Sequence, residues 1–110
     1  MGIFVKGEVI VIPFPFSDLS RIKRRPALVI KPLTGDDIIL CQITAKQRQD
    51  QYSVSISSND FDQGSLHQNS FVRTNRLFTA DSNIIIKSVG TLKNNKTSEV
   101  ITRIIKLIQS

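Results

Sequence analysis

Short apolar runs, broken by proline, glycine and polar residues, make up most of this chain. Some alternate between apolar and polar positions, as in Tyr52–Ile56, which is typical of a strand with one buried face. Others, such as Ile38–Thr44, are almost wholly apolar and indicate a central strand. Together the runs predict six strands, at Val5–Ile12, Ala27–Ile30, Ile38–Thr44, Tyr52–Ile56, Ser70–Phe78 and Ile84–Leu92.

Prolines and glycines set the expected boundaries of these strands. Pro13 and Pro15 should end the first strand, because proline cannot donate a hydrogen bond to a sheet ladder. Pro26 should start the second strand, after a polar connection, and Pro32 should stop it. Other expected irregularities are a turn at Thr34–Asp37, a short helical turn at Ser58–Gly64 and a kink or bulge at Gly90.

The hydrophobic period changes after Leu92. The apolar residues near the end fall on one side of a helix, with Glu99, Arg103 and Lys106 outside, and Asn94–Ser98 offers several N-caps. The apolar side consists of Val100, Ile101, Ile104, Ile105, Leu107 and Ile108. Six short strands and one C-terminal helix predict a mainly β fold, a small, strongly bent β-barrel whose helix covers one opening.

Length and composition point to a single domain over residues 1–110, with 40% hydrophobic residues. The longest unbroken apolar runs have four residues, as in Val9–Ile12, so no membrane-spanning helix is expected. Met1–Gly7 has no apolar segment of the kind found in signal peptides. The single cysteine, Cys41, is expected to pack as a small hydrophobe. These features predict a soluble protein of the cytoplasm.

Charge indicates the kind of partner. Fifteen Lys and Arg against nine Asp and Glu give a formal charge of +6, which favours a polyanionic partner such as RNA, DNA or an acidic protein. The Arg21–Arg25 segment alone carries four of the positive charges. The alternative is a charged surface that serves only solubility.

The chemistry of RNA cleavage fits the residues beside this segment. RNA carries its own nucleophile, the 2′-hydroxyl, so an enzyme need only align it, stabilise charge on the phosphorus and assist the leaving oxygen. Arg25, at a strand start, offers a guanidinium that meets two phosphate oxygens at once, and Thr44 offers a hydroxyl. The chain has one histidine, His67, so a histidine acid–base pair is impossible. No His, Cys or Asp cluster has metal-ligand spacing.

Several segments, in order, resemble the PemK/MazF family of toxins from bacterial toxin–antitoxin pairs, over nearly the whole chain. They are Gly7–Val9, Pro13–Phe16, Arg24–Arg25–Pro26 with Ala27–Ile30, Gln42–Ile43–Thr44, Ser70–Arg73 and Gly90–Leu92. The resemblance implies an SH3-like barrel and a sequence-selective endoribonuclease that cleaves single-stranded RNA without a metal or other cofactor. It also implies a homodimer and a cognate antitoxin, which we expect to cover the basic segment with an acidic, disordered stretch.

The resemblance carries over to individual residues. Arg25 matches the family's catalytic arginine, Thr44 its catalytic threonine, and Arg73 an active-site arginine of some members. The chain departs from the family at Ala45, where a serine is common, and at Asn75, where some members have an aspartate. The residues expected to bind RNA, through charge, hydrogen bonds or the stacking of Phe16 on a base, are Phe16, Ser17, Ser20, Arg21, Lys23, Arg24, Gln42, Lys46, Arg73 and Asn75.

Two other functions remain open from the sequence. A gyrase-poisoning toxin shares this barrel but needs no arginine–threonine pair. A nucleic-acid-binding domain without catalysis agrees with the departures at Ala45 and Asn75. For the expected homodimer, Phe71 and Phe78 could supply a self-complementary apolar patch.

Overall fold

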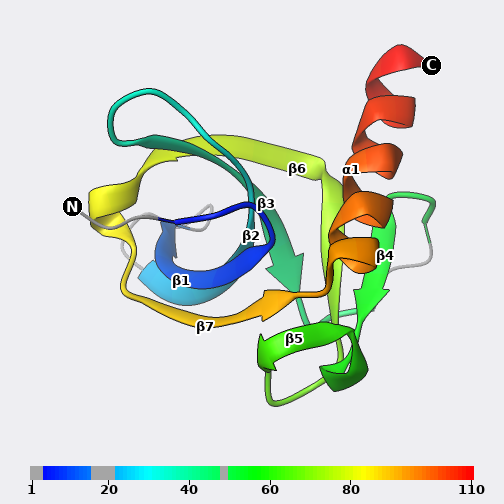
Figure 1. Ribbon diagram of the computed structural model, residues 1–110, viewed down its shortest axis with the longest axis horizontal. Coiled ribbons are helices and arrows are strands. Elements are labelled where there is room, and N and C mark those ends of the chain that lie inside the picture. The colour runs from blue at the N-terminus through cyan, green and yellow to red at the C-terminus, as the bar shows by residue number, and fades with distance from the viewer. Residues whose placement is uncertain (1–3, 16–21, 48–49) are drawn as a thin grey trace.

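The structure is a computed structural model and describes residues 4–15, 22–47 and 50–110. This part of the chain forms one curled antiparallel sheet of seven strands, in the order β4-β6-β3-β2-β1-β7-β5, and one long helix, α1 (Figure 1). The strands are β1 (Glu8–Pro15), β2 (Ile22–Pro32), β3 (Asp37–Thr44), β4 (Ser53–Ile56), β5 (Phe61–Gly64), β6 (Ser70–Asp81) and β7 (Lys87–Leu92), and α1 is Asn94–Gln109. Two single 3-10 turns lie at Ser58–Asp60 and Ser82–Ile84. The expected mainly β fold with a C-terminal helix is confirmed.

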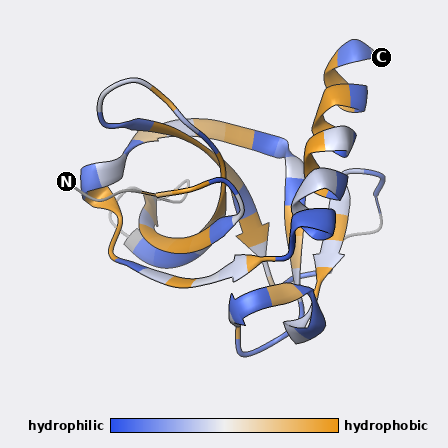
Figure 2. Cartoon of the chain, viewed as in Figure 1, coloured by the Kyte–Doolittle hydropathy of each residue, from blue (hydrophilic) through white to orange (hydrophobic). Residues whose placement is uncertain are grey.

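Both faces of the central strands are buried. Val9, Leu28 and Cys41 pack on the face covered by α1, in a cluster that also takes Val100 and Ile104 from the helix. We call this the helix-side core. Their neighbours along the strands pack on the opposite face, the far-side core, formed by Ile10, Ile12, Ala27, Val29, Ile38 and Leu40. Figure 2 shows the result as broad hydrophobic stretches along the curled strands.

Several strand boundaries differ from the prediction, and two of the differences lie at prolines. β1 runs through Pro13 to Pro15, and β2 begins at Ile22, ahead of Pro26. The β1–β7 ladder ends at Val11 and the β2–β3 ladder ends at Ala27. Pro13, Pro15 and Pro26 therefore lie where their strand has a partner on one side only, and there proline is tolerated.

β5 was missing from the prediction, which gave Ser58–Gly64 as one helical turn. The turn ends at Asp60, and Phe61–Gly64 then pairs with β7. Gly64 has a φ of 70°, and a Cβ there would lie 2.7 Å from the Cα of Gly90. Two glycines facing each other thus allow the backbones of β5 and β7 to come this close. The expected bulge near Gly90 is present, since Val9 pairs with Gly90 and Ile10 with Ser88.

The helix is longer than its apolar pattern required. It begins at Asn94, with Lys93 as its N-cap, and runs to Gln109. Its buried residues are Thr97, Val100 and Ile104, so the stripe that faces the sheet is narrower than predicted, and Ile105 and Ile108 are exposed. In the described part of the chain no helix has the length and apolar character to cross a membrane.

Candidate functional site

Arg25 and Thr44 lie just beyond one end of the β2–β3 ladder. The β2–β3 ladder closes with the pair Ala27 and Gln42, and each of the two site residues lies two positions beyond that pair on its own strand. Side chains two apart on a strand share a face, so both belong to the face of the far-side core. Arg25 pairs across the sheet with Ile12 of β1, and Thr44 with Phe71 of β6. Both residues are partly buried, and these ladders hold their backbones.

Thr44 has one hydrogen bond that orients its hydroxyl. The backbone N–H of Lys46 donates to Thr44 Oγ1 over 3.1 Å. A hydroxyl that accepts from an amide keeps its own hydrogen for another acceptor. The hydroxyl of Thr44 can therefore donate its hydrogen to a ligand oxygen while it accepts from the turn that ends β3.

The basic residues near the pair fall on both faces of the sheet rim. Lys23 is exposed opposite Phe14, and Arg24 is exposed opposite Pro13. Alternation along β2 puts Lys23 on the face of Arg25 and Arg24 on the other. Lys46 is exposed just after β3. The expected contacts Phe16, Ser17, Ser20 and Arg21 lie outside the described residues.

Arg73, which the sequence suggested as an RNA contact, is held by partners within the protein. Its side chain is buried, with the residue 7% exposed, and its Nη1 lies 2.7 Å from Asp50 Oδ2. The same nitrogen donates to Ser53 Oγ over 3.0 Å. The hydrogen bond from Arg73 lowers the pKa of Asp50, with a further contribution from the backbone amide of Tyr52. A guanidinium held in this way ties the start of β4 to β6.

Sequence reasoning missed Asp50 altogether. It lies in a polar segment between two strands, and no spacing in the sequence connects it with Arg73, 23 positions later. Asp50 also accepts from the amide of Tyr52 over 3.0 Å and from the hydroxyl of Ser53 over 3.3 Å. One carboxylate thus organises the entry into β4.

A wide bulge in β6 lies beside the pair. Cys41 pairs with Leu77 but Ile43 pairs with Val72, so residues 73–76 stand opposite Gln42 alone. The segment before β4 holds the bulge in place, because the amide and the hydroxyl of Thr74 both donate to the carbonyl of Tyr52, over 2.9 and 2.7 Å. Bulges re-aim side chains. Here Arg73 and Thr74 turn inward, while Asn75 and Arg76 are exposed.

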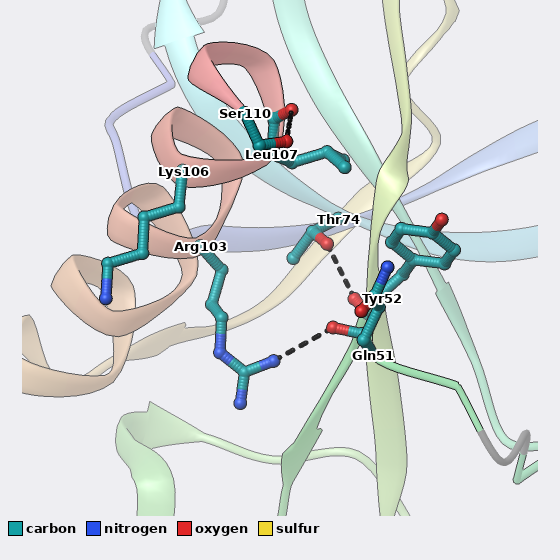
Figure 3. Close-up of a pocket in the computed structure, with 7 residues that line it drawn as sticks. All are labelled: Gln51, Tyr52, Thr74, Arg103, Lys106, Leu107 and Ser110. Carbon is teal, nitrogen blue, oxygen red and sulfur yellow. Dashed lines mark hydrogen bonds between the residues drawn. The ribbon is translucent and has the colours of Figure 1, made fainter.

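The other side of this bulge opens onto a small pocket beside α1, of about 200 Å³. Figure 3 shows Arg103 reaching from the helix to the carbonyl of Gln51, to which its Nη1 donates over 3.1 Å. Thr74 and Tyr52 form a wall of the same pocket. The pocket therefore connects α1 with the residues that hold the bulge, on the side away from Arg25 and Thr44.

Cys41 is an unreactive thiol. Its Sγ donates to the carbonyl of Arg73 over 2.8 Å, and burial raises the pKa of this thiol to about 12. A buried thiol that keeps its proton is no nucleophile at neutral pH. Among the residues that the structure describes, no three His, Cys, Asp or Glu side chains lie together so as to hold a metal ion.

Solved structures with the same fold are known. An endoribonuclease from a mycobacterial species, in complex with its cognate antitoxin, has a TM-score of 0.78 at 12% identity, covering 97% of this chain and 96% of that one. MazE–MazF from Deinococcus radiodurans gives 0.75 at 17% identity, with 94% of each chain covered. MazF alone from that organism gives 0.74 at 18% identity, with 96% of each covered. These likenesses establish the shared fold.

The sequence itself carries the family relationship. No curated protein matches it closely enough to count as a relative. The model of the PemK-like, MazF-like toxins of type II toxin–antitoxin systems matches residues 5–108, from before β1 to the last turn of α1. With its curled antiparallel sheet, its C-terminal helix and this match over nearly its whole length, the chain belongs to the PemK/MazF family of toxins.

Proposed function

We propose that this protein is a sequence-selective endoribonuclease toxin that cleaves single-stranded RNA without a metal ion, using Arg25 and Thr44. The observation that carries the proposal is the position of these two residues, each two places beyond the last pair of the β2–β3 ladder and on one face of the sheet. These two positions would oppose each other if the ladder ran on past its last pair, so both side chains leave the same face at neighbouring points of the sheet. A single phosphate group can meet both side chains.

The chemistry assigns a separate task to each participant. The 2′-oxygen of the substrate attacks the adjacent phosphorus and loses its proton, while the bond to the 5′-oxygen breaks and that oxygen gains a proton. Arg25 stabilises the charge that develops on the phosphoryl oxygens, and Thr44 donates to one of them. The products are a 2′,3′-cyclic phosphate and a 5′-hydroxyl. An electrostatic donor in such a role typically contributes about 10²–10³ in rate.

Exposed polar residues around the pair are the proposed contacts to the rest of the strand. Lys23, Arg24 and Lys46 supply positive charge, and Asn75, exposed on the β6 bulge, supplies an amide. Contacts of this kind hold the RNA backbone and weaken as salt rises. Phe16, Ser17, Ser20 and Arg21 stay predicted contacts from the sequence. Arg73 is assigned instead to holding β4 against β6, because it is buried and paired with Asp50.

We further propose a homodimer that is neutralised by a cognate antitoxin. Two of the similar structures are complexes of such a toxin with its antitoxin. The exposed basic residues Lys23, Arg24 and Lys46 suit an acidic, initially disordered antitoxin segment that competes with RNA. Of the two aromatic residues expected at the dimer interface, Phe71 is partly buried beside Thr44, and Phe78 is partly buried in the far-side core. Sedimentation at micromolar concentration should give the mass of two chains.

The test is cleavage of a long single-stranded RNA by the purified protein in EDTA. We expect discrete fragments with 5′-hydroxyl ends, and cleavage at a mapped site should stop when the ribose 5′ to the cut is replaced by deoxyribose. Products with 5′-phosphate ends, or activity that is lost in EDTA, would contradict the mechanism. RNA that is bound but not cut would reduce the protein to a binding domain.

A further inference from the structure

A hollow of about 380 Å³ opens on the far side of the sheet, next to the proposed catalytic pair. Its wall comes from three strands and the turn after β6, with Phe14 from β1, Gln42 from β3, Phe78 and Ala80 from β6, and Ile84 beyond. These residues lie on or beside the far-side core, which Phe14, Phe78 and Ala80 extend towards solvent.

The sheet register connects the hollow to the pair. Ile12, which also lines the hollow, is the cross-strand partner of Arg25. Gln42 lies two positions before Thr44 on the same face of β3, a separation of roughly 7 Å along a strand. A strand of RNA with its phosphate at Arg25 and Thr44 therefore has its neighbouring base within reach of the hollow.

The chemistry of the wall suits a flat, mostly apolar ligand with a polar edge. Phe14 and Phe78 meet edge to face, with ring centroids 5.5 Å apart and an interplanar angle of 61°, and they make a rigid aromatic surface. Gln42 supplies an amide, which can donate and accept, and Arg76 is exposed at the rim. The volume is that of a small-molecule site. A simple anion would leave the aromatic wall unused.

We propose that this hollow is a subsite for one nucleobase next to the scissile phosphate. In it Phe14 and Phe78 pack against the base, Gln42 reads its hydrogen-bonding edge, and Arg76 meets the backbone outside. Base edges and stacking are how proteins select single-stranded RNA sequences. The proposal rests on the ribonuclease function proposed above and gives that function its sequence preference at one position.

The first test uses wild-type protein and short RNAs with one mapped cleavage site. The two nucleotides flanking the cut are replaced one at a time by an abasic nucleotide. We expect kcat/KM to fall about ten-fold or more for one of the two positions, because the base–pocket contacts are lost there. Equal cleavage of both abasic RNAs and the parent would overturn the proposal. Failure of wild-type protein to cut the parent RNA would instead overturn the ribonuclease function.

The second test fills the hollow. Ala80→Phe adds a ring inside it, whereas Thr79→Phe adds the same ring at the exposed neighbouring position, which does not line it. We expect Ala80→Phe to lower kcat/KM on the parent RNA about ten-fold and to lose its sensitivity to the abasic position. Thr79→Phe should behave as wild type. Retained abasic sensitivity in a folded Ala80→Phe protein would contradict the proposal.

Two further measurements decide the remaining cases. Gln42→Leu keeps a side chain of similar size and removes the amide, so it should still cleave but should change which base is preferred at the sensitive position. An unchanged preference would count against the proposal even if Ala80→Phe does not fold. An apolar hollow could instead be a dimer interface, and sedimentation of Ala80→Phe tests this alternative. If wild type is a dimer and Ala80→Phe is a monomer, a second copy of the chain occupies the hollow and the proposal is overturned.

Discussion

Asp50 and Arg73 form a close ion pair, with 2.7 Å between Oδ2 and Nη1, that joins the start of β4 to the β6 bulge. The arginine is buried and the aspartate is exposed at the surface. Removing the carboxylate leaves a buried guanidinium without this partner, which is more costly than the loss of an ordinary surface pair.

We therefore expect Asp50→Asn to lower the melting temperature by about 4 °C or more, because the melting temperature of a domain of this size responds strongly to the loss of one such contact. Asp62→Asn, an exposed aspartate on β5, is the matched control and should change it little. Thermal unfolding followed by circular dichroism measures both. Equal melting temperatures for the two variants would contradict the structural role of Asp50.

The same pair predicts a dependence of stability on pH. The pKa of Asp50 is lowered in the folded protein, first by the hydrogen bond from Arg73. The contribution of Asp50 to the free energy of unfolding is therefore complete above its pKa in the unfolded chain, about 4. It is lost as the pH falls through the lower pKa of the folded protein. The stability difference between wild type and Asp50→Asn should be constant from about pH 5 to 7 and should shrink below about pH 4. Urea unfolding across this range measures it, and a difference that grows on acidification would contradict the assignment.

Arg25→Ala should abolish RNA cleavage, with a loss of at least about 10²-fold in rate, while the protein stays folded. Arg25 lies beyond the β2–β3 ladder, and the ladders of this sheet are made by backbone groups, which the substitution keeps. Lys31→Ala removes an exposed charge from the same strand, away from the site, and should cleave as wild type does. Cleavage assays, with circular dichroism for folding, decide the matter. Full activity in folded Arg25→Ala protein would remove Arg25 from the mechanism.

Thr44→Val keeps the branched shape and deletes the hydroxyl together with its hydrogen bond from the amide of Lys46. We expect kcat to fall about ten-fold or more and KM to change little, because the hydroxyl acts on charge that develops during the reaction. Thr44→Ser, which restores the hydroxyl, should recover most of the rate. A loss confined to KM would mean that Thr44 only binds RNA.

Gly64 and Gly35 both have positive φ, 70° and 77°, but only Gly64 is crowded. A Cβ at Gly64 would collide with the carbonyl oxygen of Val89, whereas at Gly35 nothing lies within 4 Å. Gly35→Ala should therefore cost only the conformational penalty of about 1–2 kcal/mol. Gly64→Ala should cost clearly more, since it also forces β5 away from β7. Chemical unfolding of the two variants compares them, and equal costs would show that the close approach of the strands is dispensable.

The sequence by itself determined most of the strands and the C-terminal helix. Strand alternation and the change to a helical period after Leu92 are properties of neighbouring residues, and neighbouring residues are what a sequence displays. Arg25 and Thr44, 19 positions apart, were proposed for catalysis through the family resemblance of the segments around them. The sequence did not predict β5, because this strand depends on its pairing with β7 and because Gly64 and Gly90 come together only in the folded sheet. The prolines of β1 and β2 were misread because only the sheet order shows on which side a strand lacks a partner.

Only the tertiary structure decided what Arg73 contacts. Its burial and its pairing with Asp50 depend on a bulge that sets residues 73–76 against Gln42, and such a register shift has no signal in a single strand. The hollow beside the pair likewise joins residues from β1, β3 and β6 that are far apart in the chain. Alternation depends on the backbone geometry of each strand, whereas ion pairs, bulges and cavities depend on which strands the fold brings together.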